Sequence, residues 1–225
     1  MRYRIRDNLS YCVIGDHAVF LDVEADRYFT LPDNVQRAFL AYADAPDRGV
    51  VAPALLASGI LAPIGPGEGD VASVRIEPPS RSAQEMPDSK TNLDAMMIAE
   101  VMVTLWRCRR QLKMKSLKDV LDIAVGYRAS RCLPRAGSAS PFSEQPLLQA
   151  ASVFRRLRRY IPVAMCCLPD SLALSHFLAR RGFRSNIVFG ITYDPFAAHC
   201  WVQSGDIALN ETVGTAMTHT IIRVV

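Results

Sequence analysis

The stretch Cys166-Cys167-Leu168-Pro169-Asp170-Ser171-Leu172-Ala173-Leu174 organises the C-terminal half of this 225-residue chain. Pro169 suits the first turn of a helix, because its φ is already restricted and the N–H that it lacks would have no intrahelical partner there. Apolar residues at helical spacing follow, and Gly182 is a stop signal. The stretch therefore predicts a helix over residues 169–181, with Cys167 at its N-terminus.

A cysteine at a helix N-terminus can have one of two roles. The unpaired N–H groups and the positive end of the helix dipole favour thiolate over thiol, which is one way to make a cysteine nucleophilic. Alternatively, Cys167 is a buried, unreactive thiol in front of an ordinary core helix, which is the more common situation of a free cysteine. On this stretch alone both interpretations stay open.

The composition is that of a globular protein with reduced thiols. Half of the residues are hydrophobic and 21% are charged, so a core can form without disulfides. Six cysteines without C-x-x-C spacing make a poor disulfide framework. The first residues lack the apolar core of a secretory signal, and the most apolar window, 95–106, is shorter than the roughly 20 residues of a membrane span. We expect a cytoplasmic protein without a membrane span.

The N-terminal part predicts a small domain that combines strands and helices. Residues 11–14, 18–23 and 27–30 alternate as three short strands, with Gly15-Asp16 and Glu24-Ala25-Asp26 as the turns of an antiparallel meander. Helices are predicted over 31–42 and 51–58. A segment rich in Pro, Gly and Ser, residues 66–90, then predicts a linker between a first domain, 1–65, and a second domain, 91–225.

The second domain predicts helices first and antiparallel strands afterwards, an α+β arrangement. Helices are expected over 93–114, 117–127 and 147–161, and strands over 186–191, 199–203, 206–209 and 220–224. The arginines of the third helix, Arg155, Arg156, Arg158 and Arg159, predict a solvated face or a contact with an acidic partner. The formal net charge of +4 is mild and does not call for nucleic acid.

The order of Cys167, His199 and a later acid matches the needs of thiol catalysis. The imidazole has to take the thiol proton and later give one to a leaving amine, and an acid or amide must hold its other nitrogen. Here the cysteine precedes a helix, His199 opens a strand, and Asp206, Asn210 and Glu211 lie on the returning strand. His199 could instead be a core histidine. Neighbouring Cys200 should face the other side of the strand, so we expect no metal site.

Several motifs together resemble those of a known family. Cys167-Leu-Pro-Asp-Ser-Leu-Ala-Leu, Phe177-Leu-Ala-Arg-Arg-Gly, Phe196-Ala-Ala-His-Cys-Trp-Val-Gln and Leu209-Asn-Glu resemble the transglutaminase-like, papain-like leader peptidase of lasso peptide biosynthesis, the B protein. The resemblance covers residues 147–225, and 91–130 more loosely. The first domain resembles the PqqD-like leader-recognition domain of winged-helix type, in its three strands followed by Leu31-Pro32 at the start of a helix.

The resemblance implies a role for each part of the chain. It implies Cys167 as nucleophile, His199 as base and Glu211 as the acid, where the family usually has an aspartate; Asp206 stays an alternative. It also implies that the leader of a precursor peptide adds to the sheet edge. The expected leader-binding residues are Arg27, Tyr28, Phe29, Thr30 and, in an adjoining groove, Leu55.

The function implied is a cysteine endopeptidase that cuts the leader from the core of a ribosomally made lasso peptide precursor. Its expected partner is an asparagine-synthetase-like macrolactam synthetase, and no cofactor is expected. Two other functions remain open: a non-catalytic module that delivers leaders, and transglutaminase or amidase acyl transfer. A DNA-binding helix-turn-helix over residues 31–61 is disfavoured, since Arg37 and Arg48 are its only cations.

Overall fold

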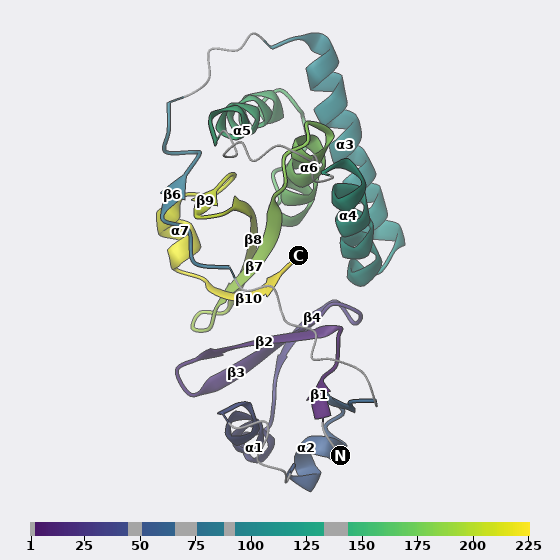
Figure 1. Ribbon diagram of the computed structural model, residues 1–225, viewed down its shortest axis with the longest axis vertical. Helices are drawn as coiled ribbons and strands as arrows, with labels where there is room; N and C mark the ends of the chain where they lie inside the picture. The colour runs from purple at the N-terminus through teal and green to yellow at the C-terminus, as the bar shows by residue number, and fades with distance from the viewer. Residues whose placement is uncertain (1–2, 45–50, 66–75, 88–92, 133–143) are drawn as a thin grey trace, which may run out of the picture. The chain divides into compact units, whose positions relative to one another are not determined.

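The structure, a computed structural model, describes residues 3–44, 51–65, 76–87, 93–132 and 144–225 (Figure 1). The chain divides into two compact units, residues 1–74 and 75–225, which are taken in turn. Within the described ranges, no helix has both the length and the apolar character that a membrane crossing requires.

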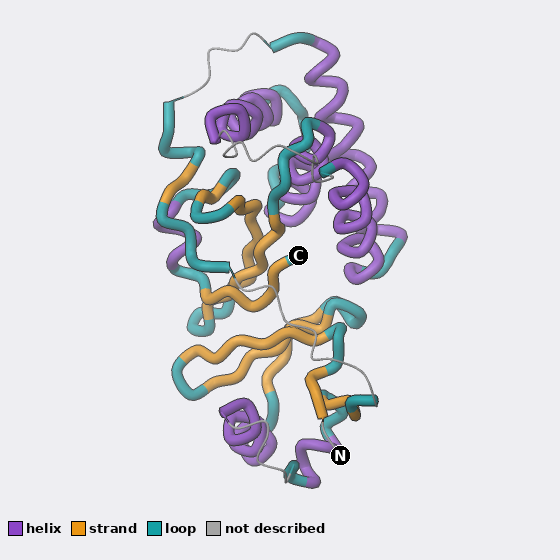
Figure 2. Tube along the Cα trace, in the orientation of Figure 1, coloured by secondary structure: helices purple, strands orange, loops and turns teal. Residues whose placement is uncertain are grey.

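The first unit is built on a three-stranded antiparallel sheet in the order β2-β3-β4, as the alternation predicts. Gly15, with a φ of 58°, and Asp26, with a φ of 49°, form its turns. Figure 2 shows helices and a short strand pair beside this sheet. The elements of the unit are β1 (Tyr3–Ile5), β2 (Leu9–Ile14), β3 (His17–Asp22), β4 (Arg27–Thr30), α1 (Asp33–Asp44), α2 (Pro53–Ala57) and β5 (Leu61–Pro63), with β1 pairing β5.

The core of the first unit is aromatic. The Phe20 ring lies 5.2 Å from that of Phe29 and 4.8 Å from that of Phe39, measured between centroids. Leu55 of α2 belongs to the same core and is 0% exposed. The expectation that Leu55 lines a leader-binding groove is therefore corrected: Leu55 packs into the core with Phe20 and Phe39, and the neighbouring Leu56 is the exposed leucine of this helix.

Strand β4 is an edge strand, since within the described residues it pairs only with β3. Arg27 and Thr30 at its ends are exposed, and Tyr28 and Phe29 are half-buried. The Arg27 guanidinium lies over the Phe29 ring, 5.3 Å from its centroid. Recognition of a peptide at this edge stays a prediction.

The second unit has a five-stranded sheet in the order β10-β7-β8-β9-β6, with four longer helices. Figure 1 shows α6 beside β7 and β8, with α3 and α4 beyond it. The elements are β6 (Arg81–Ser82), α3 (Ala95–Met114), α4 (Leu117–Arg131), α5 (Glu144–Arg158), α6 (Cys167–Arg180), β7 (Asn186–Thr192), β8 (Ala197–Ser204), β9 (Ile207–Ala208), α7 (Val213–Met217) and β10 (Thr220–Val224). The expected α+β class is confirmed.

Helix α6 is the centre of this unit, because it contacts α3, α4 and α5 on one side and β7 and β8 on the other. Leu172, Leu174, Phe177 and Leu178 are each at most 1% exposed. Burial of each such side chain contributes about 1.5–3 kcal/mol to the free energy of folding. The helix begins at Cys167, two residues earlier than predicted, and the thiol is therefore anchored to the best-packed element of the unit.

Part of the predicted linker belongs to the second unit. Ser82 of β6 pairs in parallel with β9, and its neighbours Ser80 and Arg81 donate backbone N–H groups to the Asp206 carbonyl, at 2.9 and 3.2 Å. A two-residue strand has no detectable alternation, so composition alone could not separate it from a linker. Residues 66–75 and 88–90 of the predicted linker lie outside the described residues.

Candidate active site

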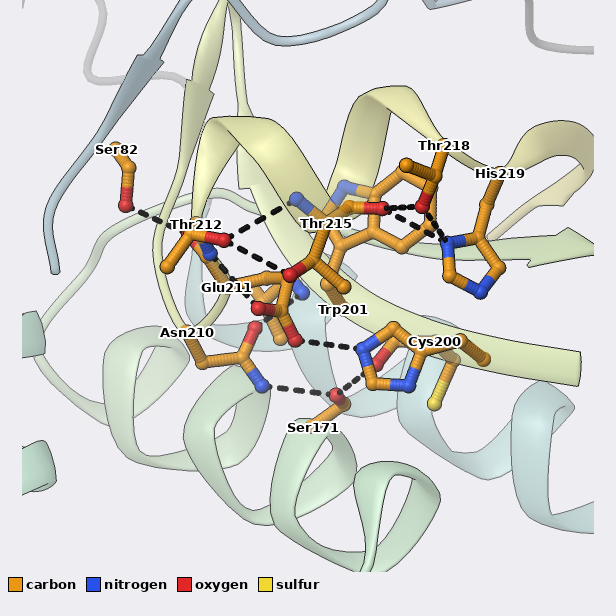
Figure 3. Close-up of polar contacts among 12 residues, drawn as sticks. Ser82, Ser171, Cys200, Trp201, Asn210, Glu211, Thr212, Thr215, Thr218 and His219 are labelled. Carbon is orange, nitrogen blue, oxygen red and sulfur yellow. Dashed lines mark hydrogen bonds and ion pairs between the residues drawn. The ribbon is translucent and has the colours of Figure 1, made fainter.

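His199 and Glu211 form a close pair in the second unit. His199 lies in β8, and Glu211 lies between β9 and α7, so the β8–β9 hairpin brings the two together. The ring Nε2 of His199 lies 2.6 Å from Oε2 of Glu211. Figure 3 draws this contact as a dashed line that starts at the labelled Glu211. The Cys167 sulfur hydrogen-bonds the same ring. Because Nε2 is engaged by the carboxylate, this second contact uses Nδ1.

The environment of Cys167 favours the thiolate. Hydrogen bonds from the Cys200 thiol and the His199 ring lower the pKa of Cys167 to about 4, against the opposing effect of burial. The same contact with Cys167, together with Glu211, raises the pKa of His199 to about 9. Between these two values the pair is a thiolate and an imidazolium, the charged pair that a cysteine nucleophile needs.

Cys200 contributes to the site from the opposite face of β8. His199 and Trp201 stack on one face, with ring centroids 6.4 Å apart, and Cys200 is buried at 2% exposure. Its contact with the Cys167 thiolate and its burial raise the pKa of Cys200 well above the ordinary thiol value. Cys200 is therefore a hydrogen-bond donor to the thiolate. The strand alternation predicted its orientation but not this contact.

Of the two candidate acids, the structure places Glu211, and not Asp206, against the imidazole. Glu211 Oε1 also accepts the Thr212 N–H at 2.8 Å. Burial acts to raise the pKa of Glu211, but the hydrogen bonds from His199 and Thr212 outweigh it, and the pKa is lowered. A carboxylate that stays ionised beside an imidazolium both orients and stabilises it.

Asp206 lies instead at the sheet surface, and this corrects its role as an alternative acid. Its carboxylate accepts hydrogen bonds from Arg81 at 2.9 and 3.0 Å and from Ser80 at 2.6 Å. The hydrogen bonds from Arg81 lower the pKa of Asp206. Asp206 lies in the tight β8–β9 turn. Its side chain faces β6, because the parallel pairing of β6 with β9 places Arg81 opposite Ile207, the residue after Asp206.

Ser82 extends the support of Glu211 into the segment that was predicted as a linker. It is 2% exposed, and its hydroxyl donates to the Glu211 carbonyl oxygen at 2.6 Å (Figure 3). The backbone of the acid is thus held by β6, while its side chain is held by His199 and Thr212. The contact between Ser82 and Glu211 has no local sequence signal, because Ser82 lies among other Ser and Pro residues that look the same in sequence.

Gly190 on β7 makes room for Trp201 and His219. It pairs with His199 across the sheet. A Cβ at position 190 would lie 2.8 Å from both the Trp201 ring and the Cβ of His219. The His219 ring lies 5.4 Å from the His199 ring and hydrogen-bonds the Thr215 carbonyl through Nδ1 at 2.8 Å. His219 is thus a neighbour of the site.

Arg158 holds the segment that leads to the thiol, which corrects its expected place on a solvated face. It is 5% exposed, and its Nε donates to Asp170 at 2.9 Å. It also donates to the carbonyls of Val163 and Ala164, at 2.8 and 3.1 Å. Asp170 in turn accepts the Cys166 N–H at 3.2 Å. The ion pair therefore fixes the approach to the helix, where Cys166 is exposed and Cys167 half-buried.

The first turn of α6 offers a donor for developing negative charge. The N–H groups of a first turn have no acceptor within the helix. The backbone N–H of Cys167 belongs to this turn, beside the sulfur, where an oxyanion would form during attack on a carbonyl. In the described part of the chain, no three His, Cys, Asp or Glu side chains gather in the manner of metal ligands.

This arrangement of thiol, imidazole and carboxylate is that of cysteine hydrolases and acyltransferases, in which the thiol attacks a carbonyl group. The comparison with protein families agrees with this class. Residues 104–224 match the Transglutaminase-like superfamily, and the chain belongs to that superfamily. The transglutaminase-like part of the predicted resemblance is thereby confirmed. The chain has no significant match to a curated protein or to a solved structure.

The charges of the site predict its pH dependence. With Cys166 replaced by serine, alkylation of Cys167 by iodoacetamide is expected to rise with a midpoint near pH 4, because the pKa of about 4 sets the thiolate population. An isolated thiol would titrate at about 8.5. Peptide mapping by mass spectrometry measures the modification at each pH, with circular dichroism as a control for folding. A midpoint near 8 in folded protein would contradict the ion pair.

Proposed function

We propose that the protein is a cysteine endopeptidase that separates the leader from the core of a ribosomally made lasso peptide precursor, before macrolactam formation. The observation that carries the proposal is the His199 imidazole held between the Glu211 carboxylate, at 2.6 Å, and the Cys167 thiol. The sequence motifs around these residues and the superfamily support the same reaction class.

In the first half of the reaction, the Cys167 thiolate attacks the carbonyl carbon of the scissile peptide bond. The oxygen becomes an oxyanion and accepts a hydrogen bond from the backbone N–H of Cys167. As the C–N bond breaks, His199 gives its Nδ1 proton to the leaving amine, which is the N-terminus of the core. The leader remains bound to the sulfur as a thioester.

In the second half, neutral His199 takes a proton from water, and the resulting hydroxide attacks the thioester carbonyl. The C–S bond breaks, the leader leaves with a new carboxylate, and the thiolate–imidazolium pair is restored. Glu211 stays ionised throughout and holds Nε2. The freed core amine is the group that an ATP-using, asparagine-synthetase-like macrolactam synthetase would join to a side-chain carboxylate, which makes such an enzyme the proposed partner.

The first unit is proposed to recruit the substrate in the cytoplasm. An extended leader can add to a free sheet edge through main-chain hydrogen bonds, while neighbouring side chains select its sequence. The β4 edge supplies the side chains proposed to contact it, which are those of Arg27, Tyr28, Phe29 and Thr30. Tethering the leader raises the effective concentration of the scissile bond at the thiol.

The test is incubation of the purified chain with a lasso precursor peptide that carries its leader, followed by mass spectrometry. We expect a free core and a leader fragment whose masses sum to the precursor plus one water. Fragment masses that include an added amine would instead identify acyl transfer by the same thioester. Binding without cleavage, also in the presence of the synthetase, would contradict the proposal and identify a delivery module.

A further inference from the structure

A second set of three residues, Ser171, Cys200 and Asn210, lies next to the proposed triad. Ser171 follows Cys167 by four residues in α6 and so lies on the same helix face. Cys200 follows His199 directly, and Asn210 directly precedes Glu211. Ser171 and Cys200 therefore share an element with a member of the triad, and Asn210 lies beside Glu211 in the connection between β9 and α7.

Hydrogen bonds join these residues into a closed ring between α6 and β8 (Figure 3). The Val202 N–H donates to Asn210 Oδ1 at 2.6 Å. Asn210 Nδ2 donates to the Ser171 hydroxyl at 3.0 Å, and that hydroxyl donates to the Cys200 carbonyl at 3.3 Å. The ring starts from β8, passes through Asn210 to the cysteine helix and returns to β8 beside His199.

The burial of the ring makes its geometry strict. Ser171 and Val202 are 0% exposed, so a lost partner would leave a polar group without water to replace it. The orientation of the Asn210 amide is determined, because the oxygen must face the Val202 N–H and the nitrogen must face Ser171. An aspartate could not donate to the serine, and an alanine would make neither bond.

The hydrogen-bond ring fixes the position of α6 relative to β8 more strictly than the apolar core can. Leucine and phenylalanine side chains hold α6 near the sheet, but their contacts are non-directional and permit small shifts along the helix axis. A hydrogen bond in a chain of three permits little displacement, because it weakens steeply as distance and angle change. The sulfur of Cys167 and the ring of His199 sit on the two elements that this chain joins.

We propose that Asn210 is a positioning residue that, through Ser171, sets the separation and orientation of the Cys167 sulfur and the His199 imidazole. The Ser171–Cys200 bond also holds the backbone of Cys200, whose thiol donates to the Cys167 sulfur. The inference rests on the cysteine nucleophile of the proposed function, but it requires no knowledge of the substrate.

The test compares Asn210→Ala, Ser171→Ala and the double variant, all with Cys166 replaced by serine. Each single substitution is expected to move the midpoint of Cys167 alkylation upward by about one pH unit, which is about tenfold less thiolate well below the midpoint. Because both variants break the same ring, the double variant should shift no further than the larger single variant. Ser171→Ala removes only one hydroxyl, so it provides the test of the ring if Asn210→Ala does not fold.

Ser175→Ala is the matched control. Ser175 is a buried serine of α6, one turn further from Cys167, and its loss should leave the midpoint unchanged. A ring that only stabilises the fold would lower the melting temperature of the Asn210 and Ser171 variants without moving their midpoints, and that result would overturn the proposal. An uncleaved precursor would overturn the peptidase function but would leave this measurement valid.

Discussion

Cys167→Ala abolishes release of the core peptide, with an expected loss of about 10⁵–10⁶-fold in kcat, as for removal of a nucleophile in other enzymes that form an acyl intermediate. A methyl group cannot form the thioester, and no other described side chain takes its place at the first turn of α6. The precursor should still bind, because the leader is proposed to contact the first unit. Product formation is followed by mass spectrometry and binding by calorimetry.

Cys166→Ala is the matched control for this experiment. Cys166 is exposed and is the N-cap residue of α6, where its side chain makes no capping hydrogen bond. Its backbone carbonyl accepts the Asp170 N–H and its backbone N–H donates to the Asp170 carboxylate, and the substitution keeps both groups. We therefore expect activity within about twofold of wild type, given the small effects usual for surface changes. Full activity in Cys167→Ala, or its loss in Cys166→Ala, would show that the nucleophile is assigned to the wrong cysteine.

Glu211→Gln is expected to lower kcat/KM by about 10²–10⁴-fold, the range in which loss of the orienting carboxylate acts in catalytic triads. Glutamine has nearly the same shape and can still reach His199 Nε2, so the loss measures the missing charge and the imidazole tautomer that the charge maintains. Without that charge the imidazolium is less stable, and the pKa of His199 should fall from about 9. A histidine titration followed by NMR measures this fall independently of any substrate.

Asp206→Asn separates the orienting role from a general effect of charge. Asp206 is exposed and pairs with Arg81, itself exposed, and such surface pairs contribute little to stability because water and salt screen them. Activity within about twofold of wild type is expected for this variant, as for other surface changes. If Asp206→Asn lowered kcat/KM as much as Glu211→Gln does, the assignment of Glu211 as the carboxylate that supports the imidazole would be wrong.

The elements that were predictable share one property, which is a local sequence signal. Helix α6 follows from Pro169, the apolar stripe and Gly182, and the three-stranded sheet of the first unit follows from alternation between turn residues. Strand β9 lies within the strand predicted over 206–209, whereas β6, with two residues, is too short to show a period. Helix α7, with five residues, was missed for the same reason, although the Thr212 side chain caps its first turn.

The side chains that were wrongly assigned depend on contacts between distant parts of the chain. Leu55 is buried because α1 and β3 cover it, and Arg158 is buried because Asp170 and the carbonyls of Val163 and Ala164 surround its guanidinium. An arginine in a basic run and a leucine in a short helix look the same in sequence whether they face the core or the solvent.

The order of the site was predictable from the sequence: a thiol at the start of a helix, an imidazole on a later strand and an acid shortly after it, which the structure places between β9 and α7. Such an order follows from local spacing and chain direction. Only the tertiary structure decided that Glu211 meets the imidazole, that Cys200 donates to the thiolate and that Asn210 ties α6 to β8. These choices depend on the distances and angles between elements, which arise when the whole unit packs and have no local signal.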